Sequence, residues 1–225
     1  MEALADRPRA IWSMLLLMVA TMAAWFIYVP VHELLHAFGC LATGGTVDEL
    51  QIQVLYGGAI LEKVFSFVQA GGAYAGRLSQ FDTGGSDLVY LATDAAPYLL
   101  TVFGGFWLLG RARLRGNPLI LGPAVVLLVA PALSLPGDYY EMGSIMVSRL
   151  IRVLSGSETA AAGVRHEDLL VVLGEFGQRF QSRRLAWGAA VAASALTGYV
   201  LASLTLAASR AWDRWITRTA ENVSR

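Results

Sequence analysis

The residues best suited to chemistry lie near the end of the first apolar run, where His32 and Glu33 precede His36 in the pattern His-Glu-x-x-His. Residues four apart lie on one face of a helix, one turn above the other. Two imidazole nitrogens at that spacing can reach one zinc ion at about 2.0–2.1 Å. Glu33 would then take a proton from a water on the metal as this water attacks a peptide carbonyl. The pattern predicts one Zn2+ per chain, bound by both histidines, and a catalytic role for Glu33.

The setting of this motif favours a metal site over two ordinary polar residues at a helix end, which is the alternative interpretation of so short a pattern. Residues 11–31 carry no charge. Ionisable side chains next to such a run are costly to bury, and they usually mark a functional site. His32 and His36 are also two of the three histidines in the chain. We therefore expect a zinc site at this motif.

A catalytic zinc site takes a third protein ligand and leaves one position open for water. We expect Asp138 in that place, because Pro136 and Gly137 break the helix before it, and non-helical backbone at membrane depth is tolerated where it lines a cavity. Its alternative role is an N-cap for the helix that starts at Tyr139. Asp94, inside the second apolar run, stays open as the other ligand candidate. Less suitable candidates are Cys40, Glu141 and His166.

Composition places the motif in a membrane protein with a lipid bilayer as its surroundings. The 225 residues are 56% apolar and 15% charged, whereas soluble domains are about 45–50% apolar and about 25% charged. The 17 basic and 17 acidic residues cancel, so no net field suggests a nucleic-acid partner. A single cysteine excludes an intrachain disulfide framework and a four-cysteine zinc site.

Several apolar stretches are long enough to cross a hydrocarbon core about 30 Å thick. The first continues into the motif as one helix over residues 11–42, which argues against a cleaved signal peptide. Residues 139–154 carry charges and are expected as a partly embedded helix that continues the third span after a break near residues 131–138. The sequence predicts an all-α, polytopic helical bundle of four to five transmembrane segments, with spans at residues 11–31, 88–110, 116–154 and 185–209.

The segment 43–86 differs in kind from the spans. Apolar and polar residues partly alternate over 47–55, a turn follows at Tyr56-Gly57-Gly58, and a similar pattern returns over 59–68. Alternation on both sides of a glycine turn predicts a β-hairpin. A strand edge at membrane depth would have to be buried, lie at the interface or receive a partner strand.

The sequence divides into three parts. A core occupies residues 1–154, a polar segment follows over 155–184, and a last span with a basic tail occupies 185–225. Leu169, Leu173, Phe176 and Phe180 recur at helical spacing in the polar segment, which predicts an amphipathic helix. The last span carries small residues at every fourth position over 186–202, which let helix backbones approach closely. This stripe is expected to dock on the bundle or on a second copy in a homo-oligomer.

Together these features resemble the site-2 protease family of intramembrane zinc metalloproteases, over about residues 28–154. The His-Glu-x-x-His motif at the end of an apolar helix is similar to the zinc helix of the family. Tyr56-Gly57-Gly58 resembles its membrane-associated β region, and Leu135-Pro136-Gly137-Asp138 resembles its proline-rich break with the third ligand. Ala96-Pro97 resembles a small-residue and proline element of its central helix.

The resemblance implies hydrolysis of a peptide bond in or near a transmembrane segment of a partner protein, commonly to release a regulator. It supports Asp138 as the third ligand and makes Gly57 and Gly58 candidate substrate-binding residues. A helical substrate would have to unwind first, and we expect the edge of the 47–68 hairpin to receive the unwound segment by strand addition.

Two questions stay open at this level. The competing function is a catalytically silent membrane adaptor, or pseudoprotease, that binds transmembrane helices; an intact Glu33 argues against it. Orientation is the second question. Arginines before the first span and at 111–115 favour a cytoplasmic N-terminus, whereas the resemblance places the zinc motif nearer the cytoplasm. The Ala-, Gly- and Arg-rich composition is typical of bacteria, so we expect an integral multi-pass protein of a bacterial cytoplasmic (inner) membrane.

Overall fold

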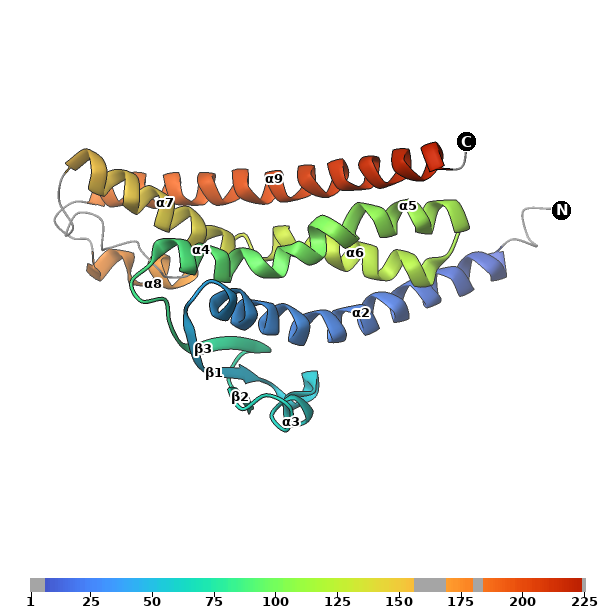
Figure 1. Ribbon diagram of the computed structural model, residues 1–225, viewed down its shortest axis with the longest axis horizontal. Coiled ribbons are helices and arrows are strands. Elements are labelled where there is room, and N and C mark those ends of the chain that lie inside the picture. The colour runs from blue at the N-terminus through green and yellow to red at the C-terminus, as the bar shows by residue number, and fades with distance from the viewer. Residues whose placement is uncertain (1–6, 156–168, 180–183, 224–225) are drawn as a thin grey trace.

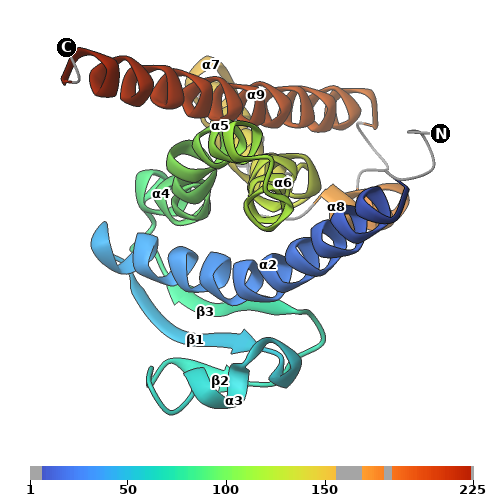
Figure 2. The ribbon, with the colours of Figure 1, turned by 90° about the vertical axis from the view of Figure 1, so that its right-hand side faces the viewer.

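The computed structural model describes residues 7–155, 169–179 and 184–223. Four helical stretches in this part of the chain are long and apolar enough to cross a membrane, as the sequence predicts: Ala10–Ala42, Asp87–Arg115, Pro118–Leu154 and Leu185–Ala220. They run side by side, and a small sheet lies against the first of them (Figure 1). Viewed from the end, the sheet, the first helix, the two middle stretches and the last helix follow one another as layers (Figure 2).

The first stretch is a single helix, α2, from Arg7 to Ala42. Its 36 residues include Pro30, which does not end the helix. At a rise of about 1.5 Å per residue, it exceeds the thickness of a hydrocarbon core. Apolar side chains such as Trp12 and Ile27 are exposed on it, while Tyr28 and Val29 are buried against the bundle. The metal motif therefore lies on the C-terminal part of a long helix, near the sheet.

The second stretch is helical throughout but changes its winding. It consists of α4 (Asp87–Ala95), a 3-10 turn η2 (Ala96–Tyr98), a π-helical segment η3 (Thr101–Gly105) and α5 (Phe106–Arg115). Ser209 from the last helix meets the π segment. Its hydroxyl donates to the carbonyl of Thr101 at 2.7 Å and accepts from the amide of Phe106 at 3.1 Å. A side chain from another helix thus satisfies backbone groups that the change in winding would leave without partners.

The third stretch contains a true break. Helix α6 (Pro118–Leu133) ends, residues 134–137 form a turn, and helix α7 (Asp138–Ser155) begins. The turn is held by backbone bonds, from the amide of Tyr139 to the carbonyl of Ser134 at 3.2 Å and from the amide of Leu169 to the carbonyl of Pro136 at 2.9 Å. The break lies within the predicted region 131–138 and makes Asp138 the first residue of a new helix.

The last helix, α9 (Arg184–Val223), packs closely along α7. A methyl group in place of the hydrogen of Gly198 would lie 2.5 Å from the carbonyl oxygen of Tyr139, and one on Gly143 would lie 2.2 Å from that of Ser194. Ser194 and Ala202 are buried in this contact. Within the chain, the predicted stripe of small residues therefore serves the contact between α7 and α9.

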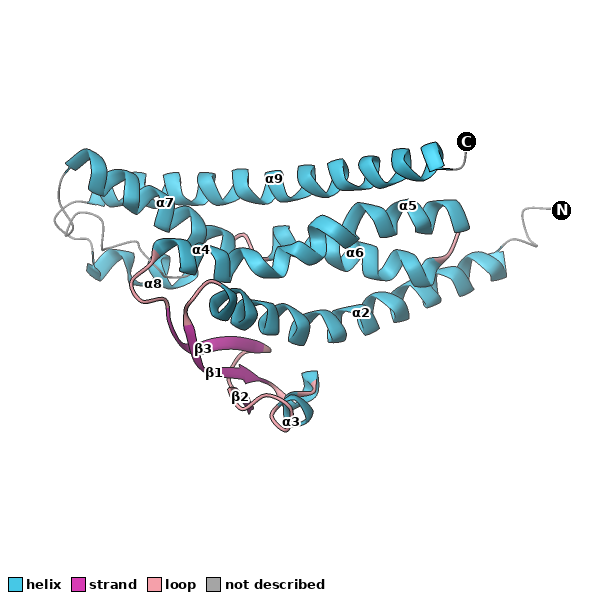
Figure 3. Ribbon diagram, viewed as in Figure 1, coloured by secondary structure: helices cyan, strands magenta, loops and turns pink. Residues whose placement is uncertain are grey.

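The region 43–86 forms a three-stranded sheet in the order β2-β1-β3, on the outer side of α2 (Figure 3). The central strand β1 (Thr46–Ile52) pairs in parallel with β2 (Val68–Ala70) and antiparallel with β3 (Gly76–Asp82). Leu50 and Ile52 are fully buried against α2. The sheet thus uses its apolar face to attach to the helix that carries the motif.

This sheet corrects the predicted hairpin. The turn at residues 56–58 does not join antiparallel strands, because a 3-10 turn (Val54–Tyr56) and the short helix α3 (Gly58–Leu61) follow β1. Leu61 ends α3 and Phe65 follows it after a turn, and both side chains pack on the core of the sheet. The antiparallel partner comes instead from β3, whose residues Gly76–Asp82 show little alternation.

The polar segment contributes helix α8 (Leu169–Arg179). Val172 is fully buried against Tyr140 and α9, whereas Leu173 is half exposed. The buried face therefore follows Leu169 and Val172 rather than the predicted Leu169 and Leu173. Phe180 and most of the polar segment, 156–168 and 180–183, lie outside the described residues.

Candidate metal centre

Three side chains from two helices converge in the middle of the bundle. His32 and His36 come from α2, and Asp138 comes from the start of α7. The Nε2 atoms of the two histidines are 3.1 Å apart, and Oδ2 of Asp138 lies 3.3 Å from that of His32 and 3.5 Å from that of His36. The two histidines are buried and Asp138 is partly exposed. The spacing along α2 and the break before α7 thus bring one ligand atom from each side chain to a common point.

This triangle of atoms fits a tetrahedral zinc ion. Ligands about 2.0–2.1 Å from zinc lie about 3.3–3.4 Å from one another in a tetrahedron, close to the three distances of 3.1, 3.3 and 3.5 Å. A circle through the three atoms has a radius of about 1.9 Å. The three side chains could therefore hold one zinc ion between them without rearrangement.

Hydrogen bonds at the Nδ1 atoms orient the two histidine rings. Nδ1 of His36 lies 2.9 Å from the carbonyl oxygen of Thr93. A carbonyl can only accept, so Nδ1 carries the proton and, in the neutral ring, Nε2 carries the lone pair. Nδ1 of His32 lies 2.8 Å from the hydroxyl of Tyr28, one turn earlier on α2. Partners of this kind orient metal-binding histidines and set their tautomer.

Close packing between α2 and α4 brings the carbonyl of Thr93 to His36. A side-chain carbon on Gly39 would lie 2.6 Å from the Cβ atom of Ala96 and 2.9 Å from the carbonyl oxygen of Ala92. Only glycine leaves room for that approach. Gly39, which stands one turn after His36, therefore helps to set the orientation of the His36 ring.

Glu33 lies beside this centre under the first residue of β3. A side-chain carbon on Gly76 would lie 2.3 Å from Cγ and 2.8 Å from Cδ of Glu33, so the strand passes directly over the carboxylate side chain. Gly76 pairs with Ile52 in the register of β1, which anchors the strand at this position. The sheet thus confines Glu33 on one side, while the other side opens on the cavity described next.

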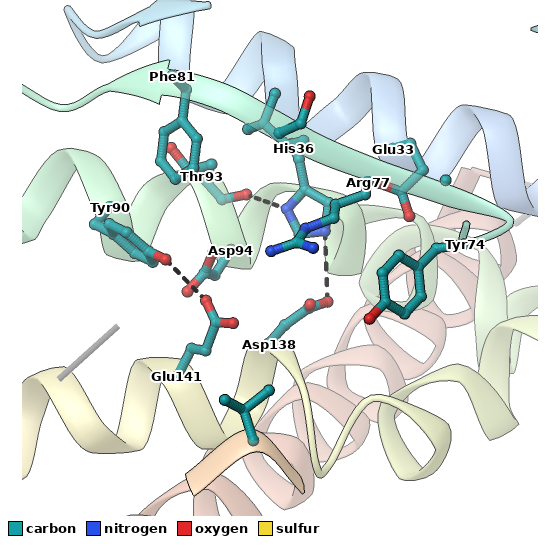
Figure 4. Close-up of a pocket in the computed structure, with 14 residues that line it drawn as sticks. Glu33, His36, Tyr74, Arg77, Phe81, Tyr90, Thr93, Asp94, Asp138 and Glu141 are labelled. Carbon is teal, nitrogen blue, oxygen red and sulfur yellow. Dashed lines mark hydrogen bonds and ion pairs between the residues drawn. The ribbon is translucent and has the colours of Figure 1, made fainter. Parts of the chain in front are cut away.

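A cavity of about 450 Å3 opens beside Glu33, His36 and Asp138, whereas His32 is not among the residues that line it (Figure 4). This volume lies within the range of about 300–1,000 Å3 typical of ligand pockets. Strand β3 forms one wall, α4 and α7 form two others, and Val171 of α8 contributes to the rim. Four carboxylates and one guanidinium line it: Glu33, Asp94, Asp138, Glu141 and Arg77. Tyr74, Phe81 and Tyr90 add aromatic surface, and the hydroxyl of Tyr90 donates to Glu141 at 2.9 Å.

The remaining candidate residues lie elsewhere. Asp94 lines the cavity, but within the described residues the group that could share one ion contains only His32, His36 and Asp138. Gly57 and Gly58 lie at the junction of the 3-10 turn and α3, and they are not among the residues that line the cavity. Of the other candidate ligands, Cys40 has a buried thiol that faces the carbonyl of Thr46, and His166 lies outside the described residues.

Three residues of the site were not foreseen from the sequence: Tyr98, Thr93 and Gly76. The hydroxyl of Tyr98 donates to Oδ2 of Asp138 at 2.5 Å. In the sequence it follows Ala96-Pro97 as one more aromatic residue of an apolar span. Thr93 acts through its backbone, which no sequence pattern marks, and Gly76 owes its role to the strand above Glu33.

No family model matches the chain, and no curated protein or solved structure matches it either. The chemistry of the centre therefore has to be inferred from its own geometry.

Proposed function

We propose that this protein is an intramembrane zinc-dependent endopeptidase. The observation that carries the proposal is the convergence of Nε2 of His32, Nε2 of His36 and Oδ2 of Asp138, whose separations from one another fit three ligands of one zinc ion. The three residues belong to stretches that are long and apolar enough to cross a membrane. Ionisable residues in such stretches are costly and usually functional. The Glu33 carboxylate and a cavity that it lines together with His36 and Asp138 add what hydrolysis requires.

The chain's own residues would divide the work as follows. A zinc ion held by the three ligands supplies Lewis acidity towards water and a peptide carbonyl. Glu33 takes the proton from the attacking water and later delivers it to the leaving amine, as a general base and then a general acid. The strand above Glu33 restricts the side chain to the cavity side.

The substrate is, on this proposal, a transmembrane segment of a partner protein that unwinds locally near the site. One edge of β3 pairs with β1, and residues 76–79 and 81 line the cavity. An unwound segment could add to the free edge of β3 as a further strand. This replaces the hairpin edge expected from the sequence, since β1 is the central strand. A proline scan over residues 77–81 tests the idea, and full cleavage at every position would sink it.

The proposal is tested by comparing Glu33→Gln with Glu62→Gln in the full-length chain, reconstituted with a library of single-span peptides and read by mass spectrometry of fragments. Glu62 is exposed after α3, so its change is the matched control. We expect Glu33→Gln to lower cleavage about 10²–10⁴-fold, with zinc content unchanged. Wild-type protein that binds zinc and cleaves no peptide would favour the silent adaptor instead.

The same proposal places the protein in a membrane as an integral multi-pass protein, with the bacterial cytoplasmic membrane as its expected location. The first residues of α2, the last residues of α9 and the connection from α5 to α6 lie at one end of the bundle (Figure 1). Arg111, Arg113 and Arg115 precede that connection. The charge bias therefore favours this end in the cytoplasm. Alkaline phosphatase fused to the C-terminus should be inactive, and an active fusion would reverse the orientation.

A further inference from the structure

Tyr98 occupies a position that the hydrolytic mechanism above does not use. It ends the 3-10 turn η2 of the second stretch and is 3% exposed. Its hydroxyl donates to Oδ2 of Asp138 at 2.5 Å. The same oxygen lies 3.3 and 3.5 Å from the histidine nitrogens. One carboxylate oxygen therefore faces both histidines and a phenol. Among the described contacts of this oxygen, only the phenol is a hydrogen-bond donor from outside the proposed ligand set.

The ring of Tyr98 has little freedom to move away from this contact. Its centroid lies 4.4 Å from that of Tyr139 and 5.7 Å from that of His32. Met142 and Ala202 complete the apolar cluster around it. A buried tyrosine usually finds a partner for its hydroxyl, because an unpaired one is costly. Packing fixes the ring, and the fixed ring in turn fixes where the hydroxyl can donate.

Asp138 needs such a partner more than the histidines do. The histidines stand on an unbroken helix, and each has a partner for its Nδ1 atom. Asp138 begins a helix directly after a turn, and its side chain is 23% exposed to the cavity. A carboxylate at the start of a helix can rotate or turn towards its own backbone amides. A hydrogen bond to one oxygen selects the rotation in which that oxygen faces the histidines.

We propose that Tyr98 is a positioning residue of the metal centre, which holds Oδ2 of Asp138 towards the histidines by donating a hydrogen bond to it. The inference rests on the proposed zinc site and deepens it. Groups of this kind, one contact beyond the ligands, typically change metal affinity about 10–100-fold when removed. Tyr98 also connects the second and third stretches at the centre, so the change in winding at η2 gains a role in the site.

The test compares Tyr98→Phe with Tyr139→Phe in the full-length chain in detergent. The two rings are neighbours, and each change removes one hydroxyl, but the hydroxyl of Tyr139 donates to Thr205 at 2.8 Å and points away from the ligands. We expect Tyr98→Phe to weaken zinc binding about 10–100-fold in a chelator competition. It should also change the visible spectrum of the cobalt-substituted protein. Tyr139→Phe should leave both unchanged.

A loss of packing alone would imitate part of this result, so a double-mutant cycle with Asp138→Ala, which removes the acceptor oxygen, separates the two. If Tyr98 acts through Asp138, Tyr98→Phe has no further effect on metal binding in the Asp138→Ala background. An equal loss in both backgrounds overturns the positioning role. Equal zinc affinities of the wild-type protein and Tyr98→Phe would overturn this inference alone. Folded wild-type protein that binds no zinc would overturn the metal centre and this inference together.

Discussion

Two of the membrane-length stretches depart from a regular α-helix, and they do so in different ways. The second changes its winding over residues 96–105 but stays helical, and Ser209 satisfies the backbone groups at the π segment. The third stops altogether at residues 134–137, and its turn is held by backbone bonds, one of them from α8. The two irregular segments meet where Tyr98 donates to Asp138.

The two irregular segments have different roles: the π segment serves helix packing, whereas the turn at 134–137 presents a side chain of the candidate metal centre. Within a membrane, every backbone group must find a partner inside the protein. The π segment meets this demand through a hydroxyl of a neighbouring helix and presents no charged group at that point. The turn at 134–137 presents a carboxylate at the cavity. We therefore expect changes at the turn to affect metal binding, and changes at the π segment to affect stability alone.

The largest expected effect comes from the ligand that the turn presents. Asp138→Ala removes one of three ligands, and we expect zinc affinity to fall by more than the roughly 100-fold upper range of groups that only support a ligand. Chelator competition on purified protein measures it. Asp94→Asn, in the same cavity, is the matched control and should change affinity little. A greater loss with Asp94→Asn than with Asp138→Ala would move the third ligand to the second stretch.

A smaller effect is expected where α9 presses on the start of α7. Gly198→Ala places a methyl group 2.5 Å from the carbonyl oxygen of Tyr139, so the two helices must separate. We expect a loss of about 1–3 kcal/mol in stability, and weaker zinc binding because the shift reaches Asp138. Thermal unfolding in detergent and chelator competition measure the two effects.

Gly110→Ala on α5 is the control for this change, since its methyl group meets only Oδ1 of Asp213, at 3.5 Å. A helical glycine replaced by alanine without a clash should gain up to about 1 kcal/mol. Equal effects of the two substitutions would show that the contact between α7 and α9 does not limit the approach of the helices.

The smallest effect is expected at the π segment. Ser209→Ala removes a donor and an acceptor from a fully buried position. Hydrogen bonds between membrane helices are worth about 0.6 kcal/mol on average and up to about 1.7 kcal/mol, so we expect a loss of about 1 kcal/mol with zinc affinity unchanged. Ser203→Ala is the control, because its exposed hydroxyl bonds only within α9. Weaker zinc binding in Ser209→Ala would contradict the separation of packing from chemistry.

Much of the architecture could be predicted because it depends on local sequence. Apolar runs of sufficient length indicate the four apolar helices, and the prolines mark the break before Asp138. Helical spacing places His32 and His36 on one face of α2. The structure brings these three residues together, while the zinc itself stays a prediction.

The features that could not be predicted depend on contacts between distant segments. The choice between Asp94 and Asp138 depends on how α4 and α7 pack around α2. The antiparallel partner of β1 is β3, about 30 residues later, whereas the adjacent segment supplies only the short parallel strand β2. Tyr98 looks like any aromatic residue of a span, and only its distance to Asp138 distinguishes it.

The turn at residues 134–137 also sets an order of events during synthesis. His32 and His36 leave the ribosome early, whereas Asp138 follows about 100 residues later, which at about 5–20 residues per second is a delay of several seconds. Helix α9, which packs on the start of α7, is made last. Zinc content of arrested nascent chains of increasing length would show the step at which the centre closes. Until Asp138 emerges, a growing chain would hold the histidine pair without the third proposed ligand, so the proposed centre would close only after the helices from α2 to α6 have been made.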